Sequence, residues 1–301
     1  MDLVATMDSL PKPGETVSGS LFTMVPGGKG ANQAVAAARL GSKVNMVGKL
    51  GQDDFADRLR QNLQSSGVNV DHITPCELPT GTAFVLVERG GENSIVVIAG
   101  ANSQCLPEDI DKAKERIAAS EIILLQLEIP IETVLHAAKL GRDLGSTVIL
   151  DPAPAQQLPP EIWSQIDIAI PNETELSAYT GMEVTGIESA ITAGRKLIDR
   201  GCNTLVVKLG KQGALILKDQ STIHIPAFTV DTVDTTAAGD AFAGALAHSL
   251  LQGNPLPDAV QFANAVGALT TTKLGAQDSL PWEEAVRAFL ANTDLPRKEV
   301  I

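Results

Sequence analysis

From residue 107 onward, short apolar runs alternate with amphipathic helical segments, and this alternation constrains the fold more than any other feature. Mainly apolar runs predict strands at 121–127, 146–150, 167–170, 204–209 and 214–218. Helical periodicity predicts helices between and after them, at 107–118, 131–144, 173–180 and 189–200. Continuous apolar strands joined by crossover helices favour an α/β fold with a mainly parallel central sheet covered on both faces.

The N-terminal third shows a different pattern. Residues 16–24 alternate loosely, and the β-rich runs 82–88 and 94–99 are separated by the turn residues 89–93, which predicts a hairpin. These segments favour a small sheet apart from the main body. We therefore expect a single domain over residues 1–301 that carries a β lid formed by about 12–26 and 80–100.

Composition excludes several classes of function. The formal net charge of -13 argues against nucleic acid or an anionic membrane as partner, since both require a basic surface. No apolar run approaches a membrane-spanning length, and the N-terminus lacks the basic and apolar regions of a signal peptide. Three scattered cysteines and four histidines show no metal-ligand spacing. We expect a cytoplasmic protein.

A small, polar stretch leads into a helix near residue 240. Ala237, Ala238 and Gly239 precede an apolar helical run, so their N–H groups are expected at a helix start, where anions bind. Asp240 lies in the same turn. It has two interpretations: a carboxylate that stabilises the helix dipole, or a general base beside an anion hole, as phosphoryl transfer to a hydroxyl requires.

A second glycine-rich turn, residues 27–33, also opens a helix. It matches neither the Walker A spacing nor G-x-G-x-x-G. One interpretation is a tight turn before a core helix. The other is close approach of the backbone to a small polyhydroxy ligand, with Lys29 and Asn32 supplying hydrogen bonds.

Polar side chains follow several of the predicted strands. In open α/β sheets ligands bind beyond the carboxyl ends of the strands, so these side chains are candidates for one site: Glu128, Asp151, Asn172, Glu175 and Lys208. Asn172 and Glu175 have an equally valid structural interpretation as a helix capping box. The alternative is that Glu175 holds hydrated magnesium through water.

Taken together, four motifs resemble the PfkB carbohydrate kinase family, and within it the ribokinase group. The motifs are residues 27–32, 172–175, 208–213 and 234–240. Shorter matches occur at 99–102, 126–128, 151–154 and 275–277. The resemblance covers residue 2 to about residue 290. It implies a ribokinase-like three-layer fold and ATP-dependent phosphorylation of D-ribose at its 5-hydroxyl.

The resemblance also implies a role for individual residues. Asp240 is the expected base, and the N–H groups around Ala237, Ala238 and Gly239 are the expected anion hole. The sugar is expected at Asp2, Gly28, Lys29, Gly30, Ala31, Asn32, Glu128 and Asp240. ATP is expected at Asn172, Lys208, Leu209, Gly210, Lys211, Gln212, Gly213, Gly239 and Asn264.

Metal ions and a partner chain follow from the same resemblance. Glu175 is expected to hold Mg²⁺ through water. A K⁺ site is expected at Asp234, Thr236, Thr270, Lys273, Gly275 and Ser279. The β lid is expected to form the interface of a homodimer.

The chain departs from the family pattern in two places. Asp2 aligns with the last residue of a Gly-Ser-x-Asn-x-Asp sugar motif, so we expect the usual first strand and one sugar-binding Asn to be absent. Lys208 stands where the family commonly has Thr. Two alternatives to ribose phosphorylation therefore remain: a kinase for another small sugar, such as deoxyribose or fructose, and a catalytically weak sugar- or nucleotide-binding protein.

Overall fold

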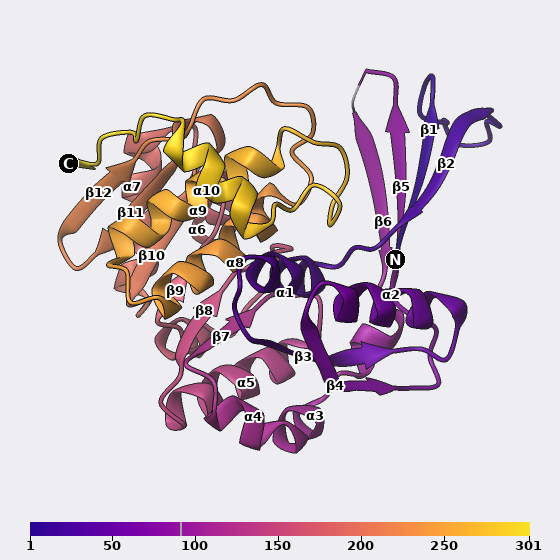
Figure 1. Ribbon diagram of the computed structural model, residues 1–301, viewed down its shortest axis with the longest axis horizontal. Coiled ribbons are helices and arrows are strands. Elements are labelled where there is room, and N and C mark those ends of the chain that lie inside the picture. The colour runs from indigo at the N-terminus through magenta and orange to yellow at the C-terminus, as the bar shows by residue number, and fades with distance from the viewer. Residues whose placement is uncertain (91) are drawn as a thin grey trace.

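The computed structural model describes residues 1–90 and 92–301, and within them the strands form three sheets (Figure 1). The largest has seven strands. Their order across the sheet is β13 (Glu299–Val300), β12 (Ser221–Ile225), β11 (Ala214–Lys218), β10 (Thr204–Lys208), β9 (Ile168–Ala169), β8 (Thr147–Leu150) and β7 (Ile122–Leu125). Strands β7 to β10 are parallel, and β10 to β13 are antiparallel. The parallel half is the part that the apolar runs predict.

Helices cover both faces of this sheet and bury two separate cores. One face carries α3 (Pro107–Lys112), α4 (Lys114–Ala118), α5 (Ile131–Asp143), α6 (Glu173–Thr180) and α7 (Ile187–Asp199). The other carries α1 (Lys29–Arg39), α8 (Ala238–Leu251), α9 (Leu256–Thr270) and α10 (Glu283–Ala291). Strand β10 shows the reason: Leu205 and Val207 join the first core, whereas Val206 joins the second. The sheet is thus the middle layer of three.

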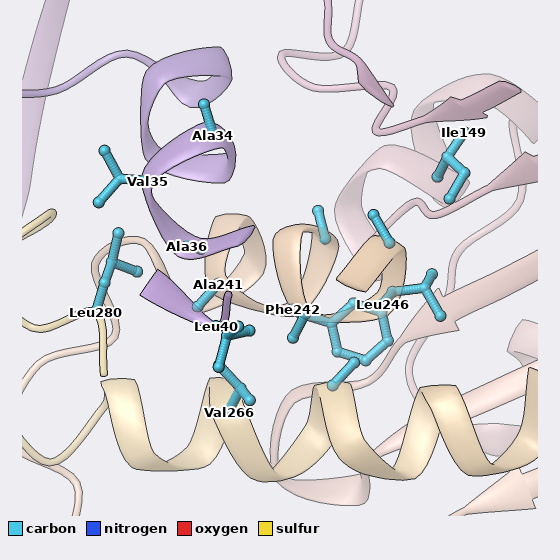
Figure 2. Close-up of a cluster of buried hydrophobic side chains, with 14 of the residues drawn as sticks. Ala34, Val35, Ala36, Leu40, Ile149, Ala241, Phe242, Leu246, Val266 and Leu280 are labelled. Carbon is cyan, nitrogen blue, oxygen red and sulfur yellow. The ribbon is translucent and has the colours of Figure 1, made fainter. Parts of the chain in front are cut away.

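Helices α1 and α8 pack closely enough to bring two distant segments together. Figure 2 shows Phe242 and Leu246 of α8 among the apolar side chains that α1 and α9 contribute. A Cβ added at Gly244 would lie 2.7 Å from the Cβ of Ala36, so only glycine allows this approach. The N-terminal ends of α1 and α8 consequently lie side by side.

Two further strands and a helix follow α1. Strands β3 (Val44–Leu50) and β4 (Val68–Pro75) form a parallel pair, with α2 (Asp54–Ser65) between them in the chain. Within the described residues, β3 pairs only with β4 and β7 only with β8. The start of α1 lies beside both strands, because a Cβ at Gly30 would meet Met46 of β3 and Gln126, which follows β7.

The third sheet extends away from the helical body (Figure 1). Its strand order is β2 (Gly19–Val25), β1 (Asp2–Met7), β5 (Thr82–Glu88) and β6 (Asn93–Ile98). The expected hairpin is present as the antiparallel pair β5–β6. Its turn, 89–93, includes Gly91, which lies outside the described residues. Strand β1, at the centre of this sheet, was not expected.

Other differences from the expected elements are local. The segment 107–118 forms two helices instead of one, with a break at Ala113, whose ψ of 4° leaves the helical region. Strands β4, β12 and β13 were also not expected. No helix in the described part of the chain is long and apolar enough to cross a membrane.

Candidate active site

Asp240 lies in the first turn of α8, and both of its carboxylate oxygens accept hydrogen bonds from α1. The amide Nδ2 of Asn32 donates to Oδ2 at 2.8 Å, and Nε2 of Gln33 donates to Oδ1 at 3.2 Å. All three side chains are buried. The carboxylate is therefore fixed in orientation by two neutral amides, and no cation forms a direct ion pair with it in the described residues.

The surroundings of Asp240 favour its protonated form. Burial raises the pKa of Asp240, and the charge of Asp151 adds to this, while Lys29 and the two amides act in the opposite direction. Burial alone would lower the pKa of Lys29. The surrounding carboxylates, with Asp240 and Asp151 first, raise the pKa of Lys29 above its ordinary value instead. The raised pKa of Asp240 increases its proton affinity, as suits a group that accepts a proton.

The turn before Asp240 presents backbone N–H groups. Ala237 caps the helix with a φ of 60°, a left-handed conformation that is rare for a residue with a side chain. The N–H of Ala238 donates to the carbonyl of Thr235 at 3.2 Å. Within the described residues, the N–H groups of Ala237 and Gly239 have no partner. Two of the three expected anion-hole groups are thus free to bind an anion.

A largely buried ion pair, Lys208–Asp151, is linked to Asp240 through the side chain of Gln33. Nζ of Lys208 donates to Oδ1 of Asp151 at 2.8 Å, and the two side chains are 13% and 2% exposed. The other oxygen of Asp151 accepts from Nε2 of Gln33 at 2.9 Å. A Cβ placed on Gly239 would lie 3.5 Å from Nζ of Lys208, so this cation sits over the start of α8.

The glycine-rich turn at the start of α1 contacts Glu128. Its Oε2 accepts the N–H of Lys29 at 2.8 Å, and burial raises the pKa of Glu128. Gly28 has a φ of 92°, and a Cβ placed on it would lie 3.9 Å from the same oxygen. Asp2 packs against Gly27, where any Cβ would collide with its carboxylate. The expected sugar residues therefore gather around one turn.

Asn172 and Glu175 form a complete capping box at the start of α6. Oδ1 of Asn172 accepts the N–H of Glu175, and Oε2 of Glu175 accepts the N–H of Asn172, both at 2.8 Å. Burial raises the pKa of Glu175. The structural interpretation of this motif is thus present in full. The motif also faces the cavity described next, so the capping role does not exclude a role in binding.

A cavity of about 410 Å³ connects these groups. It is lined by Lys29, Asp151, Ala153, Asn172, Glu173, Thr174, Glu175, Lys208, Gly210, Thr235, Ala237, Gly239 and Asp240. The expected residues Asp2, Gly28, Gly30, Ala31, Asn32 and Glu128 lie at the α1 turn beside it and do not line it. No group of three or more His, Cys, Asp or Glu side chains suited to holding a metal occurs in the described residues.

The rest of the expected nucleotide segment lies outside the cavity lining. The side chain of Leu209 is buried in the core of the α3–α7 face. Residues 210–212 form a 3₁₀ turn in which the side chains of Lys211 and Gln212 are exposed. A Cβ at Gly213 would lie 2.1 Å from the carbonyl oxygen of Ile225, so glycine is required there. Asn264 donates to that same carbonyl at 3.0 Å, which ties α9 to the end of β12.

The two loops expected to hold K⁺ are joined to each other. Oδ2 of Asp234 accepts the N–H of Gly275 at 2.9 Å, and its Oδ1 accepts from both the N–H and the hydroxyl of Thr236. Partial burial would raise the pKa of Asp234, but these hydrogen bonds lower it. The buried hydroxyls of Thr270 and Ser279 donate to backbone carbonyls in their own segments. Lys273 follows in the same turn.

Two residues, Gln33 and Gln126, gain a role only in the structure, and Asp151 gains its contacts there. Asp151 follows β8 and could be found from its strand-end position, although its contact with Lys208 could not. Gln33 follows Asn32 in the glycine-rich turn, and its amide contacts both Asp151 and Asp240. Gln126 donates to Oε1 of Gln33 at 2.5 Å. Both glutamines lie in segments with a sequence signal, 27–33 and 126–128, but no local pattern indicates their contacts.

Comparison with known proteins agrees with this geometry. Residues 1–283 match the pfkB family of carbohydrate kinases. A deoxyribokinase of Salmonella typhi is 42% identical over 294 residues, which cover 97% of this chain and 96% of the relative. The solved ribokinase of Thermotoga maritima is 41% identical with a TM-score of 0.89, covering 97% of this chain and 96% of that one. The Arabidopsis thaliana ribokinase complexed with ribose and ATP is 35% identical with a TM-score of 0.90, covering 96% and 95%. The three-layer fold expected from the resemblance is thereby confirmed.

Proposed function

Because the chain belongs to the pfkB family of carbohydrate kinases, we propose that it transfers the γ-phosphoryl group of ATP to the 5-hydroxyl of D-ribose. One observation carries this proposal. A buried carboxylate, Asp240, lies in the same helical turn as the free N–H groups of Ala237 and Gly239. This pairs a proton acceptor with an anion site, as transfer of a phosphoryl group to a hydroxyl requires.

In this mechanism Asp240 accepts the proton of the attacking hydroxyl. Its raised pKa keeps its proton affinity high, and the amides of Asn32 and Gln33 hold its two oxygens in a fixed orientation. The hydroxyl oxygen then attacks the γ-phosphorus, and the bond to the β-phosphate oxygen breaks. The products are ribose 5-phosphate and ADP.

The positive groups of the cavity offset the charge of the transferring phosphoryl group. Ala237 and Gly239, which carry the free N–H groups at the start of α8, line the cavity together with Lys29 and Lys208, and Lys208 lies close to Gly239. Preorganised donors in a buried site stabilise developing charge strongly. We assign ATP to the side of the cavity formed by Asn172, Lys208 and Gly210, and ribose to the turn that contains Gly28 and Lys29.

Two metal ions belong to the proposal. Glu175 faces the cavity, and Mg²⁺ typically keeps several waters and binds phosphate oxygens, so few protein ligands are needed. Mg²⁺ would neutralise charge on the phosphates when bound. The loops around Asp234 and Gly275 are already held together and would offer backbone carbonyls to K⁺. The proposed roles of Glu175 and of these loops are open to separate tests.

A second sugar is supported by one comparison. The Salmonella relative, 42% identical, is named a deoxyribokinase, so 2-deoxyribose is the alternative substrate. A site built to hydrogen-bond a substrate hydroxyl strongly rejects an analogue that lacks it, whereas an apolar pocket rejects an added hydroxyl only weakly. The ratio of kcat/KM for D-ribose and 2-deoxyribose therefore identifies the sugar for which this site is built.

The experiment is a coupled assay of ADP release with MgATP and a potassium salt. D-ribose, 2-deoxyribose and D-fructose are compared over the same series of concentrations, with a reaction without sugar as the blank. Ribose-dependent ADP release with the highest kcat/KM, and ribose 5-phosphate as product, supports the proposal. A higher kcat/KM for 2-deoxyribose moves the assignment to that sugar. Ribose binding by calorimetry without any ADP release would contradict a kinase role.

A further inference from the structure

The side chain of Gln33 lies between two buried carboxylates. The residue is 1% exposed. Its Nε2 group donates to Oδ2 of Asp151 at 2.9 Å and to Oδ1 of Asp240 at 3.2 Å. An amide NH₂ is one of the few neutral groups that can donate to two acceptors at once. A residue that only fills space in the core would not need to donate to two carboxylates.

The orientation of the Gln33 amide is itself determined. Nε2 of Gln126 donates to Oε1 of Gln33 at 2.5 Å, so the oxygen of Gln33 faces Gln126 and its nitrogen faces the two carboxylates. The second oxygen of Asp151 is taken by Lys208 at 2.8 Å. The contacts thus form one connected series from Lys208 through Asp151 and Gln33 to Asp240.

We infer that Gln33 is a positioning residue for the catalytic base, holding Asp240 in orientation and keeping it apart from Asp151. This inference rests on the proposed function, in which Asp240 accepts a proton. Two buried carboxylates that face each other without an intervening donor would share a proton, and Asp240 would then be unable to accept another. Gln126 contributes by fixing which end of the Gln33 amide faces the carboxylates.

The charged groups that face Asp240 come from several elements. Lys29 belongs to α1, Glu128 and Asp151 follow β7 and β8, Lys208 ends β10, and Glu175 lies in the first turn of α6. Replacing Gln33 changes none of these charges. A change in the titration of Asp240 in a Gln33 variant can therefore be attributed to the lost amide contact.

The test compares wild type, Gln33→Met and Gln126→Met, with exposed Gln104→Met as the matched control. The protein is labelled with carbon-13 at the aspartate side-chain carboxyls, and the Asp240 resonance is identified by its absence from Asp240→Asn. We expect the titration midpoint of Asp240 to rise in Gln33→Met, to rise less in Gln126→Met and to stay unchanged in Gln104→Met. We also expect kcat of Gln33→Met to fall about tenfold or more, as loss of a hydrogen bond to a charged group implies, with KM for the sugar changed less.

An unchanged midpoint together with kcat within about twofold of wild type would overturn the inference. If Gln33→Met does not fold, Gln33→Leu takes its place, because it also removes the amide without adding a charge. The Asp240 midpoint should rise in it as in Gln33→Met. The titration needs no substrate, so it reads the role of Gln33 even if wild type fails to phosphorylate ribose. A failure of the proposed function would appear instead as the absence of sugar-dependent ADP release.

Discussion

Asn32 of α1 donates its side-chain amide to Oδ2 of Asp240 in α8 at 2.8 Å, across 208 residues of sequence. Oδ1 of Asn32 in turn accepts Nε2 of Gln277 at 3.0 Å, which fixes the orientation of the Asn32 amide. The glycine-rich turn, the proposed base and the loop that contains Gly275 are therefore connected by side-chain amides.

Lys208→Met should destabilise the protein and weaken catalysis. The change leaves Asp151 buried without its cation, and removing one partner of a buried ion pair costs about 3–5 kcal/mol. It also removes a cation from above Gly239, so we expect kcat/KM for ATP to fall about tenfold or more. Thermal unfolding and steady-state kinetics measure the two effects.

Two further variants separate these effects. Lys218→Met removes an exposed lysine at the end of β11 and should leave both quantities near wild type. The double variant Lys208→Met/Asp151→Asn should regain much of the lost stability but none of the lost activity. Full activity in Lys208→Met would contradict the phosphate role of this lysine.

Asp234→Asn should lower stability at neutral pH more than at acid pH. Hydrogen bonds from Thr236 and from the N–H of Gly275 lower the pKa of Asp234 below that of the unfolded chain. A lowered pKa gives stability that is present above the unfolded value of 3.8 and is lost as pH falls through the folded value. The difference in melting temperature between wild type and variant should therefore shrink as pH is lowered below about 4.

Asp231→Asn is the matched control, since Asp231 is an exposed residue of the same loop. Its melting temperature should equal that of wild type at each pH. Loss of stability in Asp234→Asn that does not depend on pH would show that the contact acts through shape alone.

We propose that the four-stranded sheet is both the β lid and the interface of a homodimer. Every described residue of β6 is exposed, including Ile95 at 54%, Val96 at 61% and Val97 at 66%, and Phe22 of β2 is 59% exposed. Contiguous exposed apolar patches commonly mark protein–protein interaction sites. Sedimentation velocity should give a dimer for wild type and a monomer for Val97→Asp.

Leu295→Asp places the same charge at another exposed apolar residue and should remain dimeric. A monomeric wild type would exclude the interface. If the sheet also acts as a lid over the sugar, ATP hydrolysis without sugar should increase in Val97→Asp relative to Leu295→Asp.

Local patterns were sufficient to predict much of the fold. Helix α6 has the expected bounds, Glu173–Thr180, because Asn172 supplies a cap and Gly181 ends the helix in a left-handed conformation. Strand β11 also has the expected bounds. Strand β1 was missed because Asp2–Met7 mixes polar and apolar residues without clear alternation, and it is a strand through its pairing with β2 and β5. Such pairing depends on tertiary structure.

The candidate site was predictable in its parts but not in its connections. The turn around Asp240 and the strand-end residues follow from helix-start chemistry and from the rule for parallel sheets. The contacts of Gln33 with Asp151 and of Lys208 with Asp151 span 118 and 57 residues, and no local pattern encodes them. The expected absence of the family's usual first strand and the expected K⁺ site stay predictions.

The most direct measurement compares ADP release by wild type and Asp240→Asn, with MgATP, a potassium salt, and D-ribose either present or absent. Wild type should release ADP only when ribose is present. Asp240→Asn should retain its fold and its ribose binding, but its kcat should fall by roughly 10²–10⁴, because an amide cannot accept the hydroxyl proton. Near-wild-type turnover in folded Asp240→Asn would contradict the account at its centre.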